Sequence, residues 1–405
     1  MAHAASSAIG SKLPGATHES CIYLDYNATT PIEPKVAEDM APFLFEHFGN
    51  PSSGHAFARP CAEAVRKARS QVAAMLGCDA EEVLFCSCGS EADNHAIRGA
   101  CALARANGTS VPHVVSTAIE HPAILECLSA YAARGECVYD LAPVNEEGMV
   151  DPDAVAALVT PDTCLVSVMH ANNETGAIQP VAAVAEAARA AKAGVLVHTD
   201  AAQSCGKIPV KPRELKADLC TVVGHKFGAP KGVAALYIRD GIELPNMLWG
   251  GGQESGRRAG TENVLHLVGM GSASALVEAD QAALTAHMLA LRDRLEVGLR
   301  AAIGEERCSI NGPATQRLPN TSSFAIIGLR AADLLAELAD EVAASAGAAC
   351  HSGGGPRVSG VLAAMGTDTE KALGTLRLSV GRHTSEDDVD RAIQLIAATA
   401  AKHIA

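Results

Sequence analysis

The sequence predicts a large α/β domain, whose mostly parallel sheet lies between helices, followed by a smaller α+β domain. Short apolar runs alternate with alanine-rich helical stretches up to about residue 260. Strands buried on both faces read as continuous apolar runs, so this alternation indicates a parallel sheet covered by helices. After Asn263 the order of elements changes, which predicts a second unit.

The individual elements follow from length and residue type. Runs of five or six residues rich in Val, Leu and Ile predict strands, and longer alanine-rich stretches such as Val181 to Ala193 predict helices. The strands expected in the first unit are 82–86, 113–117, 164–169, 195–199 and 219–223. The second unit is expected to contain a long helix 264–303, a strand 321–327, a helix 331–340, a strand 376–380 and a terminal helix from Ser385.

The predicted organisation is a flexible lead-in at 1–20, a large domain at 21–262 and a small domain at 263–405. The first residues of the large domain are expected to pack with the small one. A chain of 405 residues is long enough for two such units.

Composition excludes several classes of function. A net charge of −14 argues against a nucleic-acid binder, which should carry a basic face. No run of eighteen apolar residues suggests a membrane span, and the first twenty residues, with one Lys and no Arg, resemble neither a signal nor a transit peptide. The 13 cysteines are odd in number and lack paired metal-binding spacing, so we expect no metal site and a reducing, cytoplasmic location.

Two polar residues indicate a cofactor. Lys226 stands in Gly-His-Lys-Phe, and Asp200 ends a predicted strand twenty-six residues earlier. A lysine amine forms a Schiff base with an aldehyde, and a buried aspartate can hold a cationic ring nitrogen. The pair predicts a site for pyridoxal 5'-phosphate (PLP).

Polar segments follow five predicted strands, and ligands of open α/β sheets bind at the carboxyl ends of strands. Each segment alone has an ordinary explanation: an N-cap serine, a structural histidine, a turn or a surface lysine. Five of them in strand order instead predict one site, with a phosphate at the helix start near Ser90. The segments are 87–90, 120–121, 172–176, 200–203 and 225–226.

These motifs resemble the class V branch of fold-type I PLP enzymes, the cysteine desulfurases and selenocysteine lyases. The resemblance runs through the chain after the lead-in. It rests on 23–31 (YLDYNATTP), 49–53 (GNPSS), 120–121 (EH), 172–176 (NNETG), 200–203 (DAAQ), 224–226 (GHK), 250–254 (GGGQE), 258–263 (RAGTEN), 347–350 (GAAC) and 377–382 (RLSVGR).

The resemblance implies the fold-type I PLP-dependent transferase fold, a homodimer with shared active sites and a role for each matching residue. Lys226 would carry PLP and act as the general base, Asp200 would pair with the ring nitrogen, and His121 would stack on the ring. The other implied cofactor ligands are Asn173 and Gln203 for the ring oxygen, Gly89, Ser90 and His225 for the phosphate, and Thr261 for the partner's phosphate. Asn27 and Arg377 would bind the substrate carboxylate.

By the same resemblance, Cys350 would attack the sulfur or selenium of L-cysteine or L-selenocysteine as a thiolate, leaving L-alanine. Its glycine-rich surroundings suit a mobile loop, whereas the alternative interpretation is a buried structural cysteine. A sulfur or selenium acceptor protein would complete the reaction.

The sequence departs from the commonest desulfurase pattern at Val223, Cys88, Ser90, Gly228 and His351. Val223 and the Ala-Cys-His-Ser run lean the prediction toward selenocysteine lyase. The alternatives are a housekeeping cysteine desulfurase that supplies sulfur for Fe-S clusters or tRNA thiolation, another class V aminotransferase, and a non-catalytic scaffold. Cys350 argues against the aminotransferases, and retention of Lys226, Asp200 and Cys350 argues against the scaffold.

Overall fold

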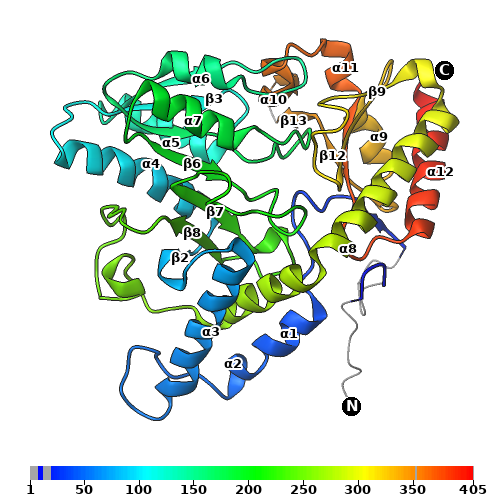
Figure 1. The fold of residues 1–405 in the computed structure, drawn as a ribbon. Coiled ribbons are helices and arrows are strands. Elements are labelled where there is room, and N and C mark those ends of the chain that lie inside the picture. Colours follow the sequence, from blue (N-terminus) through cyan, green and yellow to red (C-terminus); the bar gives the residue numbers. More distant parts are fainter. Residues whose placement is uncertain (1–7, 12–19, 352–353, 405) are drawn as a thin grey trace.

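A seven-stranded sheet forms the centre of the larger part of the molecule (Figure 1). The computed structural model describes residues 8–11, 20–351 and 354–404, with backbone only for 348–351 and 354–357. The sheet order is β2 (Val83–Cys86), β8 (Ala234–Ile238), β7 (Leu219–Val223), β6 (Leu196–Asp200), β5 (Thr163–Ser167), β3 (His113–Thr117) and β4 (Val138–Ala142). All pairs are parallel except those of β8, which runs antiparallel to both neighbours.

Helices cover both faces of this sheet. Side chains of α4 (Gly89–Ala106) and α5 (Pro122–Ala133) pack with one face in a shared apolar core. On the other face lie α3 (Ala58–Leu76) and the start of α8, and toward the β4 edge α6 (Pro152–Leu158) and α7 (Val181–Ala191). Because both faces are covered, the central strands β7 and β8 are fully buried, whereas the edge strand β4 is largely exposed.

The smaller part is built on an antiparallel sheet in the order β12 (Ser345–Ala346), β15 (Thr375–Ser379), β10 (Thr321–Ile326) and β9 (Cys308–Ile310). Helices α9 (Ala331–Glu337) and α12 (Glu386–His403) pack against it. Two short helices, α10 (Gly360–Ala364) and α11 (Thr369–Leu373), lie beside it.

Helix α8 (Val264–Ile303) joins the two parts. Leu267, Met270 and Val277 pack in the core of the large sheet, whereas Leu284 to Leu299 pack in the core of the small one. The predicted boundary at residue 262 therefore falls at the start of a helix whose first half packs in the larger core.

The N-terminal segment crosses to the small part. Strand β1 (Ile22–Tyr23) pairs in parallel with β11 (Val342–Ala343), and the chain then returns to α1 (Pro34–Met40) and α2 (Pro42–Phe45) beside α8. Residues 24–33 consequently run between the two parts, where they can line a site.

The predicted fold class is confirmed, and several details differ from expectation. Strands β4 and β8 were not among the strands predicted for the first unit, and β8 runs antiparallel to its neighbours. The segment around Cys350, expected as a loop, has backbone in a hairpin of β13 (Ala348–His351) and β14 (Gly354–Val358). Among the described residues, no helix has the length and apolar character to cross a membrane.

Candidate active site

A cavity of about 260 Å³ lies at the carboxyl ends of the parallel strands. It brings together eight residues that the sequence predicts for the cofactor site, each carried by a segment that follows a strand. They are Gly89, Ser90, His121, Asn173, Asp200, Gln203, His225 and Lys226. The expectation that five separate segments meet at one edge of the sheet agrees with this geometry.

Lys226 ends a short 3-10 turn, Gly224–Lys226, directly after β7. Its Nζ donates to the carbonyl oxygens of Asn27 at 2.7 Å and Ala28 at 2.9 Å. Burial, and then the charge of Arg377, lower the pKa of the Lys226 amine to about 8. A lowered pKa makes the neutral, nucleophilic amine available near neutral pH.

Asp200 is the last residue of β6, and its side chain is buried. Oδ1 accepts the Ala202 backbone N–H at 2.8 Å. Burial raises the pKa of this carboxyl, against the opposing effects of the Ala202 hydrogen bond, His121 and Lys226. A buried carboxylate is costly without a cationic partner, so the residue is suited to hold one inside the cavity.

The start of α4 forms the end of the cavity that suits an anion. Gly89 begins this helix, and a Cβ there would lie 2.7 Å from Cγ2 of Val223, so no larger residue fits. Ser90 follows in the first turn, where backbone N–H groups and the helix dipole favour a phosphate. His225 lies nearby in the lining, with Nδ1 3.1 Å from Oγ1 of Thr29.

Arg377 of β15 reaches Asn173 at the rim of the cavity. Nη2 binds Asp25 Oδ1 and Ser345 Oγ, both at 2.9 Å, and Nη1 lies 3.4 Å from the Asn173 carbonyl. Within the described residues Nε has no partner although it is buried. The guanidinium therefore retains capacity to bind a carboxylate.

Asn27 is more constrained than the sequence suggested. Its Nδ2 donates to Thr321 Oγ1 at 2.9 Å and lies 3.3 Å from the Asn173 carbonyl, and its Oδ1 accepts from Asn320 at 2.9 Å. A substrate contact would have to replace the longer of these bonds. Asn27 meanwhile positions the backbone carbonyl that binds Lys226.

His121 has a second contact besides the cavity, Thr261 lines another pocket, and Cys350 is described only by its backbone. His121 caps α5, with Nδ1 accepting from Ala123 N at 3.1 Å, and its ring lines the cavity. Thr261 is exposed and lines a separate pocket with Arg258 and Ser87. The side chain of Cys350 lies outside the described residues, although its backbone belongs to β13.

Sequence reasoning missed three charged residues around the cavity. Asp25 pairs with Arg377, and Asp93 of α4 is buried in the cavity wall, where burial and then Asp200 raise its pKa. Lys207 is a second buried lysine, four residues after Gln203.

A family model described as aminotransferase class-V matches residues 22–392. The chain belongs to this family. A relative named cysteine desulfurase from Trichormus azollae is 43% identical over 93% of this chain and 92% of its own length. Another, named cysteine desulfurase IscS, from Clostridium botulinum, is 40% identical over 93% of both chains.

Solved structures agree with the family. The structure of a NifS-like protein has a TM-score of 0.87 and 34% identity, covering 94% of this chain and 100% of its own. The structure of SspA in complex with cysteine has a TM-score of 0.74 and 28% identity, covering 89% and 99%. These similarities confirm a PLP-dependent enzyme of class V.

The cavity fits the cofactor on its own evidence. It offers a nucleophilic lysine and a buried carboxylate that a cation would stabilise. It also offers a helix N-terminus that begins with a glycine, where no larger residue fits. The lysine suits the aldehyde of PLP, the carboxylate suits its ring nitrogen, and the helix N-terminus suits its phosphate. The individual contacts of each residue with PLP stay predictions.

Proposed function

We propose that this protein removes sulfur or selenium from L-cysteine or L-selenocysteine and releases L-alanine. The observation that carries the proposal is the placement of Lys226 and Asp200 in one cavity, with Arg377 in contact with Asn173 of its lining. Lys226 and Asp200 suit PLP, and Arg377 suits the carboxylate of an amino acid. Bound PLP supplies an electron sink for a substrate carbanion.

Lys226 is the group that moves protons. Its ε-amine could remove the α-proton of the bound substrate and later return a proton to carbon. A general base works best when its pKa lies near the operating pH, and the Lys226 pKa of about 8 meets this condition. Asp200 would pair with a protonated ring nitrogen, a cation that would offset the burial raising the pKa of this carboxyl and would favour electron withdrawal.

Arg377 fixes the orientation of the substrate. Asp25 and Ser345 hold Nη2, so the guanidinium plane is set before substrate arrives. The unpartnered Nε, together with Nη1, can then bind a carboxylate in bidentate fashion. The structurally similar SspA has been solved in complex with cysteine, which supports an amino acid of this size as the substrate.

Cys350 is the proposed sulfur acceptor. Its thiolate attacks the substrate sulfur, the Cβ–S bond breaks, and the carbon keeps the electron pair and is protonated to become alanine. The enzyme then holds a persulfide, which a thiol or an acceptor protein removes. The backbone of this cysteine belongs to β13, and the sequence after it is glycine-rich, with glycines at positions 353 to 355.

The sequence and its relatives indicate whether the substrate carries sulfur or selenium. The relatives named above are cysteine desulfurases, which supports L-cysteine as a substrate. Val223 and His351 favour L-selenocysteine, since they depart from the commonest desulfurase pattern and resemble the selenocysteine lyases. A housekeeping role in Fe-S or tRNA sulfur supply remains the alternative.

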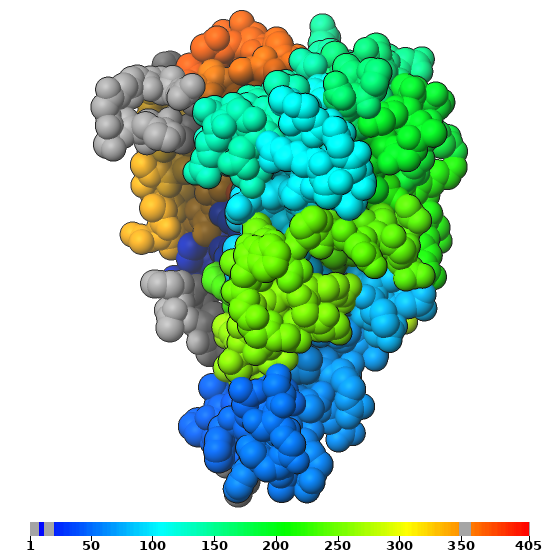
Figure 2. Space-filling view, turned by 90° about the vertical axis from the view of Figure 1, so that its left-hand side faces the viewer, coloured from blue at the N-terminus to red at the C-terminus, as the bar shows by residue number. Residues whose placement is uncertain are grey.

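We further propose a homodimer with shared active sites. Large apolar side chains lie exposed on the described surface, among them Phe45 at 83%, Phe48 at 75% and Trp249 at 80%. Figure 2 shows the segment around residue 50 beside the segment around residue 250 on one face of the molecule. Thr261 follows the second segment, so a partner covering this face would meet it.

A side-by-side assay tests the function. Purified protein is given L-cysteine or L-selenocysteine, and alanine, sulfide and selenide are measured. We expect alanine from both substrates, and none from Lys226→Ala, which should also lose the visible absorbance band of the bound cofactor. Turnover by Lys226→Ala at the wild-type rate with an unchanged spectrum would refute the proposal.

A further inference from the structure

Lys207 is a buried cation that the proposed chemistry does not use. It lies in the segment after β6 and is 3% exposed. Its Nζ donates to the backbone carbonyl of Gln203 at 2.8 Å and lies 3.3 Å from the Gln203 side-chain oxygen Oε1. Burial, and then the charge of Lys226, lower the pKa of Lys207 to about 7.

Burial of an ammonium group costs free energy, because the charge loses its hydration. An apolar side chain of similar length would pack there without losing hydration. The position of Lys207 near another lysine adds repulsion to that cost. Its retention here indicates a role that an apolar residue could not perform.

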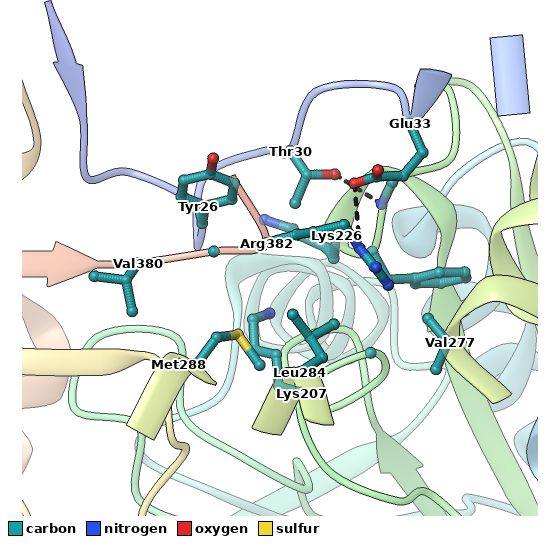
Figure 3. A pocket seen from close by; sticks show the side chains of 14 residues that line it. Tyr26, Thr30, Glu33, Lys207, Lys226, Val277, Leu284, Met288, Val380 and Arg382 are labelled. Atoms are coloured by element: carbon teal, nitrogen blue, oxygen red, sulfur yellow. Dashed lines mark hydrogen bonds and ion pairs between the residues drawn. The ribbon is translucent and has the colours of Figure 1, made fainter. Parts of the chain in front are cut away.

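The hydrogen bonds of Lys207 lead to Lys226 in two steps. Nε2 of Gln203 donates to the Asn27 carbonyl at 3.0 Å, and the same carbonyl accepts from Lys226 Nζ at 2.7 Å. Lys207 and Lys226 also line a common cavity of about 40 Å³ (Figure 3). Gln203 thus stands between the buried cation and the larger cavity, whose wall it forms.

Lys207 and the Asn27 carbonyl together fix which way the Gln203 amide faces. An ammonium has donors and no acceptor, so the amide oxygen must face it and the NH₂ group must face away. One N–H of that group binds the Asn27 carbonyl. Gln203 also lines the larger cavity, so its second N–H is the group that could donate to an oxygen bound there.

We propose that Lys207 is a positioning residue that holds the Gln203 amide with its N–H groups toward Asn27 and the cofactor. The inference rests on the proposed function, since it takes PLP as the occupant of the cavity. Lys207 itself touches no cofactor atom and acts through Gln203.

The other charges around Lys207 do not supply this orientation. Arg377 lowers the pKa of Lys207 and Cys205 opposes that effect, but neither is among the hydrogen-bond partners of Gln203. In the small cavity, Glu33 and Arg382 lie 3.7 Å apart as an ion pair, and Glu33 also binds His383.

A double-mutant cycle tests the proposal on cofactor-stripped protein. The dissociation constant for PLP is measured by absorbance titration for wild type, Lys207→Met, Gln203→Met and the double variant. We expect each single change to weaken binding about tenfold, the worth of about one hydrogen bond. The double variant should bind no more weakly than Gln203→Met alone, because Lys207 acts through that side chain.

Two controls separate positioning from folding. Lys402→Met removes an exposed lysine far from the site and should bind PLP as wild type does. Lys207→Gln can still donate to Gln203, so it should recover part of the affinity, and it replaces Lys207→Met in the cycle if that variant does not fold. In the loaded protein, Lys207→Met and Gln203→Met should shift the pH midpoint of the visible band equally.

The outcomes are distinct. Effects of Lys207→Met and Gln203→Met that multiply in the double variant would overturn the inference, as would wild-type affinity in Lys207→Met. A wild-type chain that binds no PLP would instead refute the proposed function.

Discussion

Replacing Lys226 by methionine should change how the stability of the cofactor-free protein depends on pH. The folded-state pKa of Lys226 lies at about 8, below the ordinary value of 10.5. Between these two pH values the unfolded chain binds a proton that the folded chain does not, so the stability of wild type rises with pH through this window. Below pH 8 both states are protonated, and the folded state bears the full cost of the buried charge.

The magnitude follows from the shift. A difference of about 2.5 pH units corresponds to about 3 kcal/mol, of which about 2 kcal/mol is regained between pH 8 and 9.5. The Lys226→Met variant has no such gain. It also loses two hydrogen bonds, to Asn27 and Ala28, worth about 1 kcal/mol each, and this loss does not depend on pH. The pH dependence is therefore the clean signal.

Urea unfolding followed by circular dichroism measures it. The free energies of unfolding of wild type and Lys226→Met are compared at pH 7 and pH 9.5, where titrating groups that do not interact with Lys226 cancel in the difference. Removal of Lys226 also relieves the repulsion that lowers the pKa of Lys207, which acts in the same direction. We expect wild type to gain about 2 kcal/mol relative to the variant. Lys402→Met serves as the exposed-lysine control. A difference that stays constant within about 0.5 kcal/mol would refute the burial of an ionisable Lys226.

Three further predictions concern the nucleophile, the dimer and the substrate arginine. Cys350→Ser should lower turnover of L-cysteine at least about a thousandfold, a barrier change of about 4 kcal/mol, and turnover of L-selenocysteine less, because selenium leaves more easily; equal losses in an alanine assay would contradict a sulfur-specific role. Wild type should sediment at about twice the chain mass of 41.6 kDa, and Phe48→Asp should sediment closer to the mass of a single chain. A fully active wild-type monomer would contradict the shared site. Arg377→Ala should lower kcat/KM for L-cysteine about tenfold to a hundredfold while leaving PLP affinity unchanged, and an unchanged kcat/KM would exclude the carboxylate role.

Most of the fold was predictable because its signals are local. The strands 113–117 and 219–223 and the helix 264–303 have the bounds that the sequence predicts, since apolar runs and their flanking polar residues mark them directly. The direction of β8 was not predictable, because a buried strand has the same composition in parallel and antiparallel pairs. The pairing of β1 with β11 joins residues 320 positions apart, which no local pattern encodes.

The residues of the candidate site likewise fall into those that the sequence could predict and those that only the fold reveals. Residues at strand ends, such as Asp200 and Lys226, could be assigned to one cavity by a topological rule. The Asp25–Arg377 ion pair and the bonds of Asn27 depend on the packing of the small part against the large one. Lys207 escaped notice because a lysine in sequence is ordinarily a solvated surface charge, and only the fold shows that it is buried.

The most direct test of the central claim is to locate the cofactor on the chain. The holoenzyme is reduced with sodium borohydride, digested, and the labelled peptide is identified by mass spectrometry. We predict the pyridoxyl label on the peptide that contains Lys226, and on no other lysine. A label on Lys207, the other lysine of the adjoining small cavity, or the absence of any label would contradict the assignment of Lys226 and of the cavity around it.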